Sequence, residues 1–264
     1  MAANLKNLIK LFFYIQKSNL KTAFLNKSDA FVNVLMMTIN NLSFIFMWWI
    51  IFQDRNSING WQFGQMALLF AIGNNAFGFF ALCTRGIQLI PELIENGNLD
   101  NFLTSPQNSL FLIATSEATF ANWGDFVTGF LMFFLSGYVS WHTFGIMLFC
   151  SFMGFILMFA IRLLASSLAF FVSDSQRLGD NIFISFLTFA SQPASIFTGW
   201  YKVIFLTILP AGLLSFVPVN LITNFSWSEC LFFILAVLFF FGISLFAYHT
   251  GLKRYSSGNR FGVR

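Results

Sequence analysis

Charged residues are scarce in this sequence, and their scarcity limits what the protein can be. Of the 264 residues only 9% are Asp, Glu, Lys or Arg, whereas 57% are hydrophobic. Soluble domains carry about 25% charged residues, and even large ones bury only about three quarters of the surface that the unfolded chain exposes. The composition therefore excludes a water-soluble enzyme, a nucleic-acid-binding module and a disordered scaffold. The apolar runs are continuous, which also excludes an outer-membrane barrel with its alternating strands.

Cysteine and motifs for catalysis are equally sparse. The three cysteines, Cys83, Cys150 and Cys230, lie in or beside apolar stretches, and their odd number and spacing predict neither a disulfide framework nor a metal site. The sequence has no G-x-x-x-x-G-K-[ST] phosphate-binding loop and no H-E-x-x-H motif. Since these motifs supply nucleotide binding and zinc hydrolysis, we expect no catalytic residue, no metal and no cofactor in this chain.

Long apolar runs are abundant instead, and Phe alone accounts for 40 residues. A helix needs about 20 predominantly apolar residues to cross the hydrocarbon core of a bilayer. Six segments of about this length predict an all-α polytopic membrane protein with six transmembrane helices. These segments are residues 31–52, 62–82, 117–136, 143–165, 181–201 and 230–250.

A further apolar stretch, residues 203–228, is interrupted by Pro210, Gly212 and Pro218. Proline inside a helix removes a backbone hydrogen bond and clashes with the preceding turn. We therefore predict a re-entrant element of two half-helices, which is tolerated at membrane depth only where protein or a cavity covers it. Seven full spans are the alternative.

Positive charge is concentrated near both ends of the sequence. The basic residues before the first span and after the last one are Lys6, Lys10, Lys17, Lys21, Lys27, Lys253, Arg254, Arg260 and Arg264. Because basic residues beside spans stay in the cytoplasm, both termini are predicted to be cytoplasmic, which requires an even number of crossings. Lys10 interrupts the only early apolar run, so no cleavable signal peptide is expected.

The N-terminal segment, residues 1–28, is amphipathic at helical spacing. Lysines 6, 10, 17 and 21 lie on one face, and the residues opposite them are Leu5, Leu8, Ile9, Phe12 and Ile15. Such a pattern is typical of a helix that lies along the inner leaflet with its lysines toward anionic headgroups. The alternative is a charge cluster that only sets the topology.

The loop between the second and third spans, residues 84–108, is acidic although we expect it to face the cytoplasm. It carries Glu92, Glu95 and Asp100 against a single arginine, Arg85. Acidic residues contribute little to topology, so the predicted orientation stands and the acidity requires another explanation.

Turn signals divide this loop into two short helices. Pro91 suits a first helical turn, Gly97 a left-handed stop, and Asn98 can cap a second helix over 99–103 that ends at Ser105-Pro106. Each helix would have an apolar face and a carboxylate rim. The pair would either dock on a partner or pack beneath its own spans, and the residues leave both interpretations open.

Two motifs resemble those of a known family. The run Glu95-Asn96-Gly97-Asn98-Leu99-Asp100-Asn101-Phe102-Leu103, followed by Pro106, resembles the first cytoplasmic loop of ABC-2 family transporter permeases. The run Gly251-Leu252-Lys253-Arg254-Tyr255-Ser256-Ser257-Gly258 is similar to the ending Gly-Leu-basic-basic-Tyr-Ser-Ser-Ala-Gly in the multidrug and daunorubicin-type exporter branch, although the alanine is missing. The proline-broken segment has a counterpart there as well.

The resemblance implies the membrane subunit of an ATP-driven exporter in the bacterial inner (plasma) membrane. A separate ATPase subunit would bind ATP and Mg²⁺ and dock on the loop, which is called the coupling helix in that family, and a second permease, identical or homologous, would complete the transporter. The substrate would be an amphipathic or apolar compound. The loop residues implied in docking are Pro91, Glu92, Glu95, Gly97, Leu99, Asp100, Leu103 and Pro106.

Three charges at predicted membrane depth, Glu117, Asp125 and Arg162, form a candidate charge network, because intramembrane charges are costly and usually functional. A salt link between Arg162 and Glu117 would satisfy both. Asp174, Arg177 and Asp180 are interpreted as a solvated cytoplasmic turn. The alternative functions are a lipid-linked polysaccharide exporter of the same superfamily, an ion-coupled secondary transporter and a membrane assembly factor.

Overall fold

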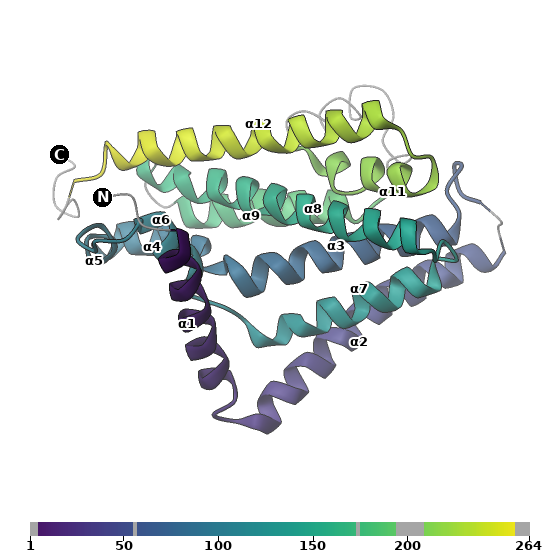
Figure 1. Ribbon diagram of the computed structural model, residues 1–264, viewed down its shortest axis with the longest axis horizontal. Helices are drawn as coiled ribbons and strands as arrows, with labels where there is room; N and C mark the ends of the chain where they lie inside the picture. The colour runs from purple at the N-terminus through teal and green to yellow at the C-terminus, as the bar shows by residue number, and fades with distance from the viewer. Residues whose placement is uncertain (1–4, 55–56, 173–174, 194–208, 257–264) are drawn as a thin grey trace.

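The computed structural model describes residues 5–54, 57–172, 175–193 and 209–256, and in these ranges the chain is helical apart from turns and one isolated bridge between Ile58 and Trp61. The elements, labelled in Figure 1, are α1 (Leu5–Ala23), α2 (Lys27–Gln53), α3 (Phe63–Cys83), η1 (Arg85–Leu89), α4 (Ile90–Glu95), α5 (Asp100–Leu103), α6 (Ser109–Thr115), η2 (Phe120–Asn122), α7 (Trp123–Leu135), α8 (Trp141–Ser167), η3 (Leu168–Phe170), α9 (Ser175–Ala190), η5 (Ala211–Leu213), α11 (Phe216–Thr223) and α12 (Trp227–Leu252).

Four helices in the described ranges are long and apolar enough to cross a membrane: α2, α3, α8 with its extension η3, and α12. They correspond to four of the six predicted spans, each within a few residues of its predicted bounds. α2 begins at Lys27, so this lysine belongs to the first span and not to the N-terminal segment.

The other two predicted spans differ more from the structure. α7 has 13 residues, a length of about 20 Å against a hydrocarbon core of about 30 Å. The chain ahead of it forms the 3₁₀ turn η2, and just before this turn Thr119 N donates to the carbonyl of Ala81 on α3. α9 covers only the first half of 181–201, and residues 194–208 lie outside the described ranges. The count of six spans therefore stays a prediction.

α3 is the centre of the bundle. It lies between α7 and α8 in Figure 1, and twelve of its residues are buried. Small residues allow the close approach: a Cβ on Gly129 of α7 would lie 2.8 Å from the Asn75 side chain, and one on Gly154 of α8 would lie 3.0 Å from Ala76. Helices in lipid commonly associate through such small residues, and Gly129 and Gly154 lie where α7 and α8 meet α3.

The proline-broken stretch is folded into the bundle as far as it is described. Pro210 precedes η5, and Pro218 occupies the first turn of α11. An N–H in the first turn has no partner within the helix, so the lack of one in proline costs no helical hydrogen bond there. Most residues from 210 to 222 are buried against α3, α8 and α12. The break is thus covered by protein, as backbone of this kind requires in a membrane. Residues 203–208 lie outside the described ranges.

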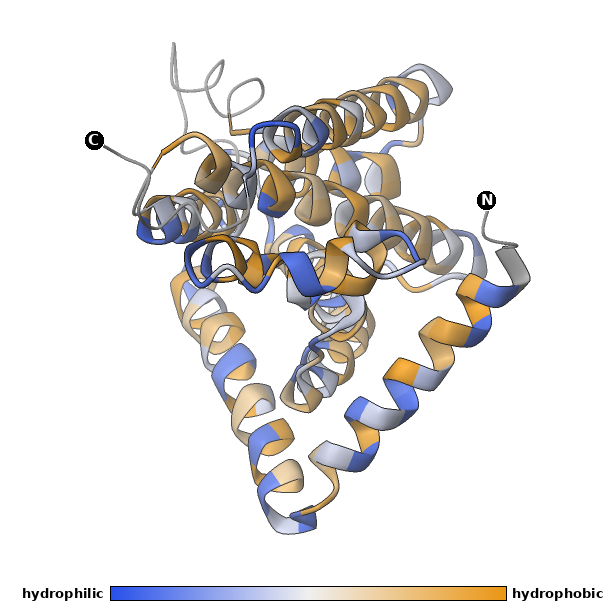
Figure 2. Ribbon diagram, turned by 90° about the vertical axis from the view of Figure 1, so that its left-hand side faces the viewer, coloured by the Kyte–Doolittle hydropathy of each residue, from blue (hydrophilic) through white to orange (hydrophobic). Residues whose placement is uncertain are grey.

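α1 runs across one end of the bundle rather than along it (Figures 1 and 2), and polar and apolar residues alternate along its length in Figure 2. α4, α5, α6 and the C-terminal end of α12 gather at the same end. The described part of the N-terminal segment therefore has the position and pattern of an interfacial helix.

Candidate coupling surface and membrane cavity

The loop after α3 is a compact structure that packs beneath the bundle. Its apolar side chains join residues of α6, α8 and α12 in a group that we call the inner cluster. The buried members of the inner cluster are Ile87, Ile90, Leu99, Leu110, Ile113, Ala114, Leu163 and Tyr248. Because α8 and α12 both contribute, the loop is fixed to two of the long helices and would move with them.

The local geometry follows most of the predicted signals. Pro91 lies in the first turn of α4, and Gly97 has a φ of +69°, the left-handed conformation expected at a helix end. Leu99 N donates to the carbonyl of Leu93 at 3.1 Å and closes the turn. The capping role predicted for Asn98 is wrong, because α5 begins one residue later than expected, with Leu99 in the N-cap position and no side-chain cap.

Close backbone packing joins η1 to α6. A Cβ on Gly86 would collide with the carbonyl oxygen of Ile113 and lie 2.6 Å from the Ser116 hydroxyl oxygen. Asn108 caps α6 by accepting a hydrogen bond from Phe111 N at 3.0 Å. The loop is thus held at its start by a contact that requires glycine and at its end by a side-chain cap.

The structure divides the predicted docking residues into two groups. Pro91 and Leu99 are buried within the loop itself, so they cannot contact a partner. The others are at least partly accessible: Glu92, Glu95, Gly97, Asp100, Leu103 and Pro106. The apolar faces therefore pack beneath the chain's own spans, while an acidic rim with Leu103 faces outward. The structure shows the packing interpretation for the apolar faces, and docking on a partner stays a prediction for the accessible rim.

The C-terminal motif meets the loop motif in space. Tyr255 packs against the inner cluster just beyond the end of α12. Burial raises the pKa of its phenol above the ordinary value, and the charge of the nearby Asp100 carboxylate raises that pKa further. Arg254 lies over the ring of Phe171, 5.0 Å from its centroid. The chain segment after the last span is thus attached to the loop and to the segment after α8.

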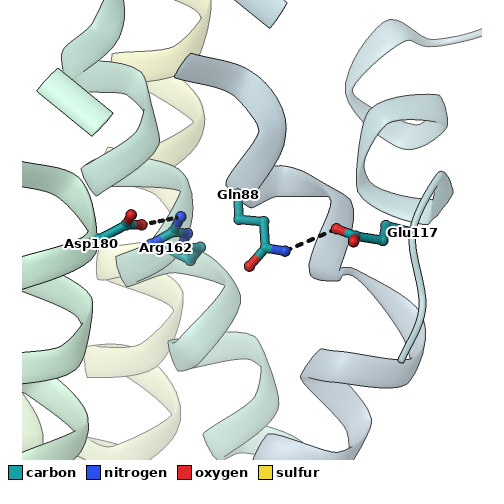
Figure 3. Close-up of polar contacts among 4 residues, drawn as sticks. All are labelled: Gln88, Glu117, Arg162 and Asp180. Carbon is teal, nitrogen blue, oxygen red and sulfur yellow. Dashed lines mark hydrogen bonds and ion pairs between the residues drawn. The ribbon is translucent and has the colours of Figure 1, made fainter. Parts of the chain in front are cut away.

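The three predicted intramembrane charges do not form one network, and Figure 3 shows the separate partners of two of them, Arg162 and Glu117. Arg162 Nη2 donates to Asp180 Oδ1 at 2.7 Å, and Glu117 accepts from Gln88 Nε2 at 2.8 Å. The proposed link between Arg162 and Glu117 is therefore wrong. The predicted solvated turn is also wrong for Arg177 and Asp180, since both residues belong to α9. Asp174 lies outside the described ranges.

Arg162 pairs with Asp180 because the arginine side chain is buried. The Arg162 side chain is 6% exposed and its partner 43%. A buried guanidinium requires a counter-charge, and it also stacks over the Phe183 ring at 5.4 Å. The contact joins α8 to the start of α9.

Asp125, the third charge, is the centre of a separate amide cluster. It is 2% exposed and accepts hydrogen bonds from Asn41 and Asn122, each at 2.7 Å. Asn41 also donates to Thr128 at 3.1 Å, and Asn74 donates to Thr128 at 3.3 Å. The cluster joins α2, α3 and α7, and Asn41 and Asn74 lie near the middle of long apolar helices.

A cavity of about 290 Å³ opens beside this cluster. Asp125, Asn41 and Asn74 contribute polar groups to its wall, and α8 and α9 complete the lining. Most of the wall is apolar, with the rings of Phe44, Phe70 and Phe77. Such a cavity, mainly apolar with a few convergent polar groups, is typical of a binding site for small organic molecules.

A family model described as ABC-2 family transporter protein matches residues 35–258. The chain belongs to the ABC-2 family. No curated protein and no solved structure matches it. The match runs from within α2 to the C-terminal motif, so it includes the loop, the cavity and the inner cluster.

ABC-2 membrane proteins work with ABC ATPase partners in transporters. The family resemblance did not indicate several residues that hold the site together. In the sequence, Asn41 is only a polar residue within an apolar run, and Asp180 is only a charged residue next to one. Gly86 is distinguished by its close contact with α6, which is visible only in the folded chain.

Proposed function

We propose that this ABC-2 protein is the permease subunit of an ATP-driven exporter. A separate ABC ATPase hydrolyses ATP, and the permease moves an amphipathic or apolar compound outward across the plasma membrane by alternating access. The observation that carries the proposal is the packed loop: its apolar side is fixed to α8 and α12, while its acidic rim remains accessible.

Rigidity of the loop is what coupling requires. When two ATPase subunits close on ATP, their motion reaches the membrane only through an element that does not deform. The packing of the loop supports this role, because Leu99 and Ile87 are fully buried and Gly86 allows contact between backbones. Glu92 and Glu95 on the rim would pair with basic residues of the ATPase and orient it, an effect of charge on specificity and association rate more than on affinity.

The aromatic cavity next to Asp125 supports a small amphipathic substrate. A positively charged group would find the carboxylate and the faces of Phe rings within one site. The cavity is mainly apolar and of the size of one small molecule, which suits the first function, and export of lipid-linked sugars stays the alternative.

The first experiment is to purify the protein from its own membranes in mild detergent and identify what accompanies it. We expect a P-loop ATPase with the wild-type chain, and a several-fold reduction with Glu92→Lys, because a lysine on the rim would repel the basic partner surface. The matched control is Asp54→Lys, an exposed acid just beyond the far end of α2. Equal amounts of ATPase with both variants would rule out acidic docking, and absence of any ATPase from an intact complex would rule out the permease function.

A further inference from the structure

A second cavity lies between α1 and the bundle, at the end where the loop packs. Its volume is about 330 Å³, within the range of pockets that hold one small molecule. One wall is the face of α1 with Phe12 and Leu20, and the other is formed by the end of α3, the η2 turn and the start of α7, including Phe79 and Phe120. We call this cavity the α1 groove.

The α1 groove is almost wholly apolar, with two exceptions. Gln16 and Asn19 of α1 both line it, and the amide nitrogens of the two side chains are buried. Neither nitrogen has a hydrogen-bond acceptor within the part of the chain that the structure describes. A buried donor that is left unpaired is strongly unfavourable, so these two amides point to an acceptor from another molecule.

The outer face of α1 indicates the charge of that molecule. Lys10, Lys17 and Lys21 are exposed on it, and α1 lies across the end of the bundle as an interfacial helix does (Figure 2). Lysines in this position attract anionic headgroups. The α1 groove therefore combines an apolar channel, two unpaired donors and adjacent positive charge.

We propose that the α1 groove binds one anionic glycerophospholipid from the leaflet in which α1 lies. An acyl chain would occupy the aromatic channel, and oxygens of the glycerol esters or the phosphate would accept hydrogen bonds from Gln16 and Asn19. A peptide would bring its own donors, which the apolar wall cannot satisfy, whereas ester and phosphate groups bring acceptors only. The site depends on the membrane location of the chain and not on the direction or cargo of transport.

Native mass spectrometry of the full-length protein in detergent tests the proposal, with phosphatidylglycerol and phosphatidylcholine of identical acyl chains as probes. We expect one retained phosphatidylglycerol per chain and about tenfold weaker binding of phosphatidylcholine. Gln16→Leu combined with Asn19→Leu should reduce phosphatidylglycerol binding about tenfold, as the loss of two hydrogen bonds implies. Asn33→Leu is the matched control, because this asparagine is exposed on α2.

A second variant fills the site without removing a donor. Ala118 lines the α1 groove, so Ala118→Trp should exclude the acyl chain and abolish the retained lipid while the melting temperature stays near that of wild type. Equal binding of the two lipids, or unchanged retention in both groove variants, would overturn the proposal. Loss of binding in the control as well would show that the lipid is bound elsewhere.

Discussion

At the scale of single residues, the ion pair of Arg162 and Asp180 shows what a search for apolar runs misses. The fifth predicted span starts at residue 181, after Asp180, but the helix that covers its first half, α9, already starts at Ser175. Such a window finds the apolar part of a helix and not its ends, so Asp180 was assigned to a loop. The folded chain uses this residue because Arg162 is buried and its charge requires a partner.

Tyr255 allows a prediction at the same scale. Burial and the Asp100 carboxylate raise the pKa of its phenol, since the phenolate is disfavoured in that place. A group whose folded-state pKa is raised contributes stability that is fully present below its unfolded pKa of about 10. That stability is lost as the pH rises through the folded value. The attachment of the tail to the loop should therefore persist at neutral pH and weaken only in strong base.

Ultraviolet titration of tyrosinate measures this directly. The difference between wild type and Tyr255→Phe isolates one phenol, which should titrate above pH 10. Asp100→Asn should move that titration downward, because the negative charge of Asp100 is removed while burial remains. Titration at the ordinary value in the wild-type protein would contradict the packing of the tail on the loop.

At the scale of elements, composition and turn chemistry predicted the long helices and the short ones of the loop. Continuous apolar runs in α3 and α8 and turn residues such as Gly97 carry strong local signals. These local signals were insufficient where contacts between distant parts of the chain determine the structure. The 3₁₀ turn that shortens α7 depends on a backbone contact with α3, and the packing of η1 on α6 depends on a glycine that no local pattern distinguishes.

Gly86 carries the prediction for this scale. Gly86→Ala places a methyl group against the carbonyl of Ile113, which is backbone and cannot turn away, so the protein should lose about 1–3 kcal/mol of stability. Gly242→Ala in α12 is the control, since a Cβ there has open space, and it should be neutral or stabilise by about 0.5–1 kcal/mol. Thermal unfolding in detergent measures both. A control that is as destabilising as the test variant would mean that the close packing of η1 is not what holds the loop.

At the scale of the whole molecule, two helices expose broad apolar surfaces, and they differ in one respect. The exposed residues of α12 are almost all apolar between Leu231 and Phe246, as expected for contact with lipid. The exposed face of α2 also carries an asparagine, Asn40, near the middle of the helix. A polar side chain facing hydrocarbon is unfavourable, and transmembrane helices commonly associate through such residues. α2 is therefore the helix that we expect to face a second permease.

Cysteine cross-linking distinguishes the two surfaces. In a chain whose three native cysteines are replaced by alanine, Asn40→Cys should give a disulfide-linked dimer on oxidation in the membrane, because equivalent positions on paired helices approach closely. Phe239→Cys, exposed on α12, should remain monomeric. If the transporter pairs two different permeases, Asn40→Cys will instead link to a chain of another mass once that chain carries a cysteine on its own first span. Efficient cross-linking through α12 alone would place the pairing surface on the opposite side of the bundle, and the asparagine on α2 would then have to face lipid or substrate.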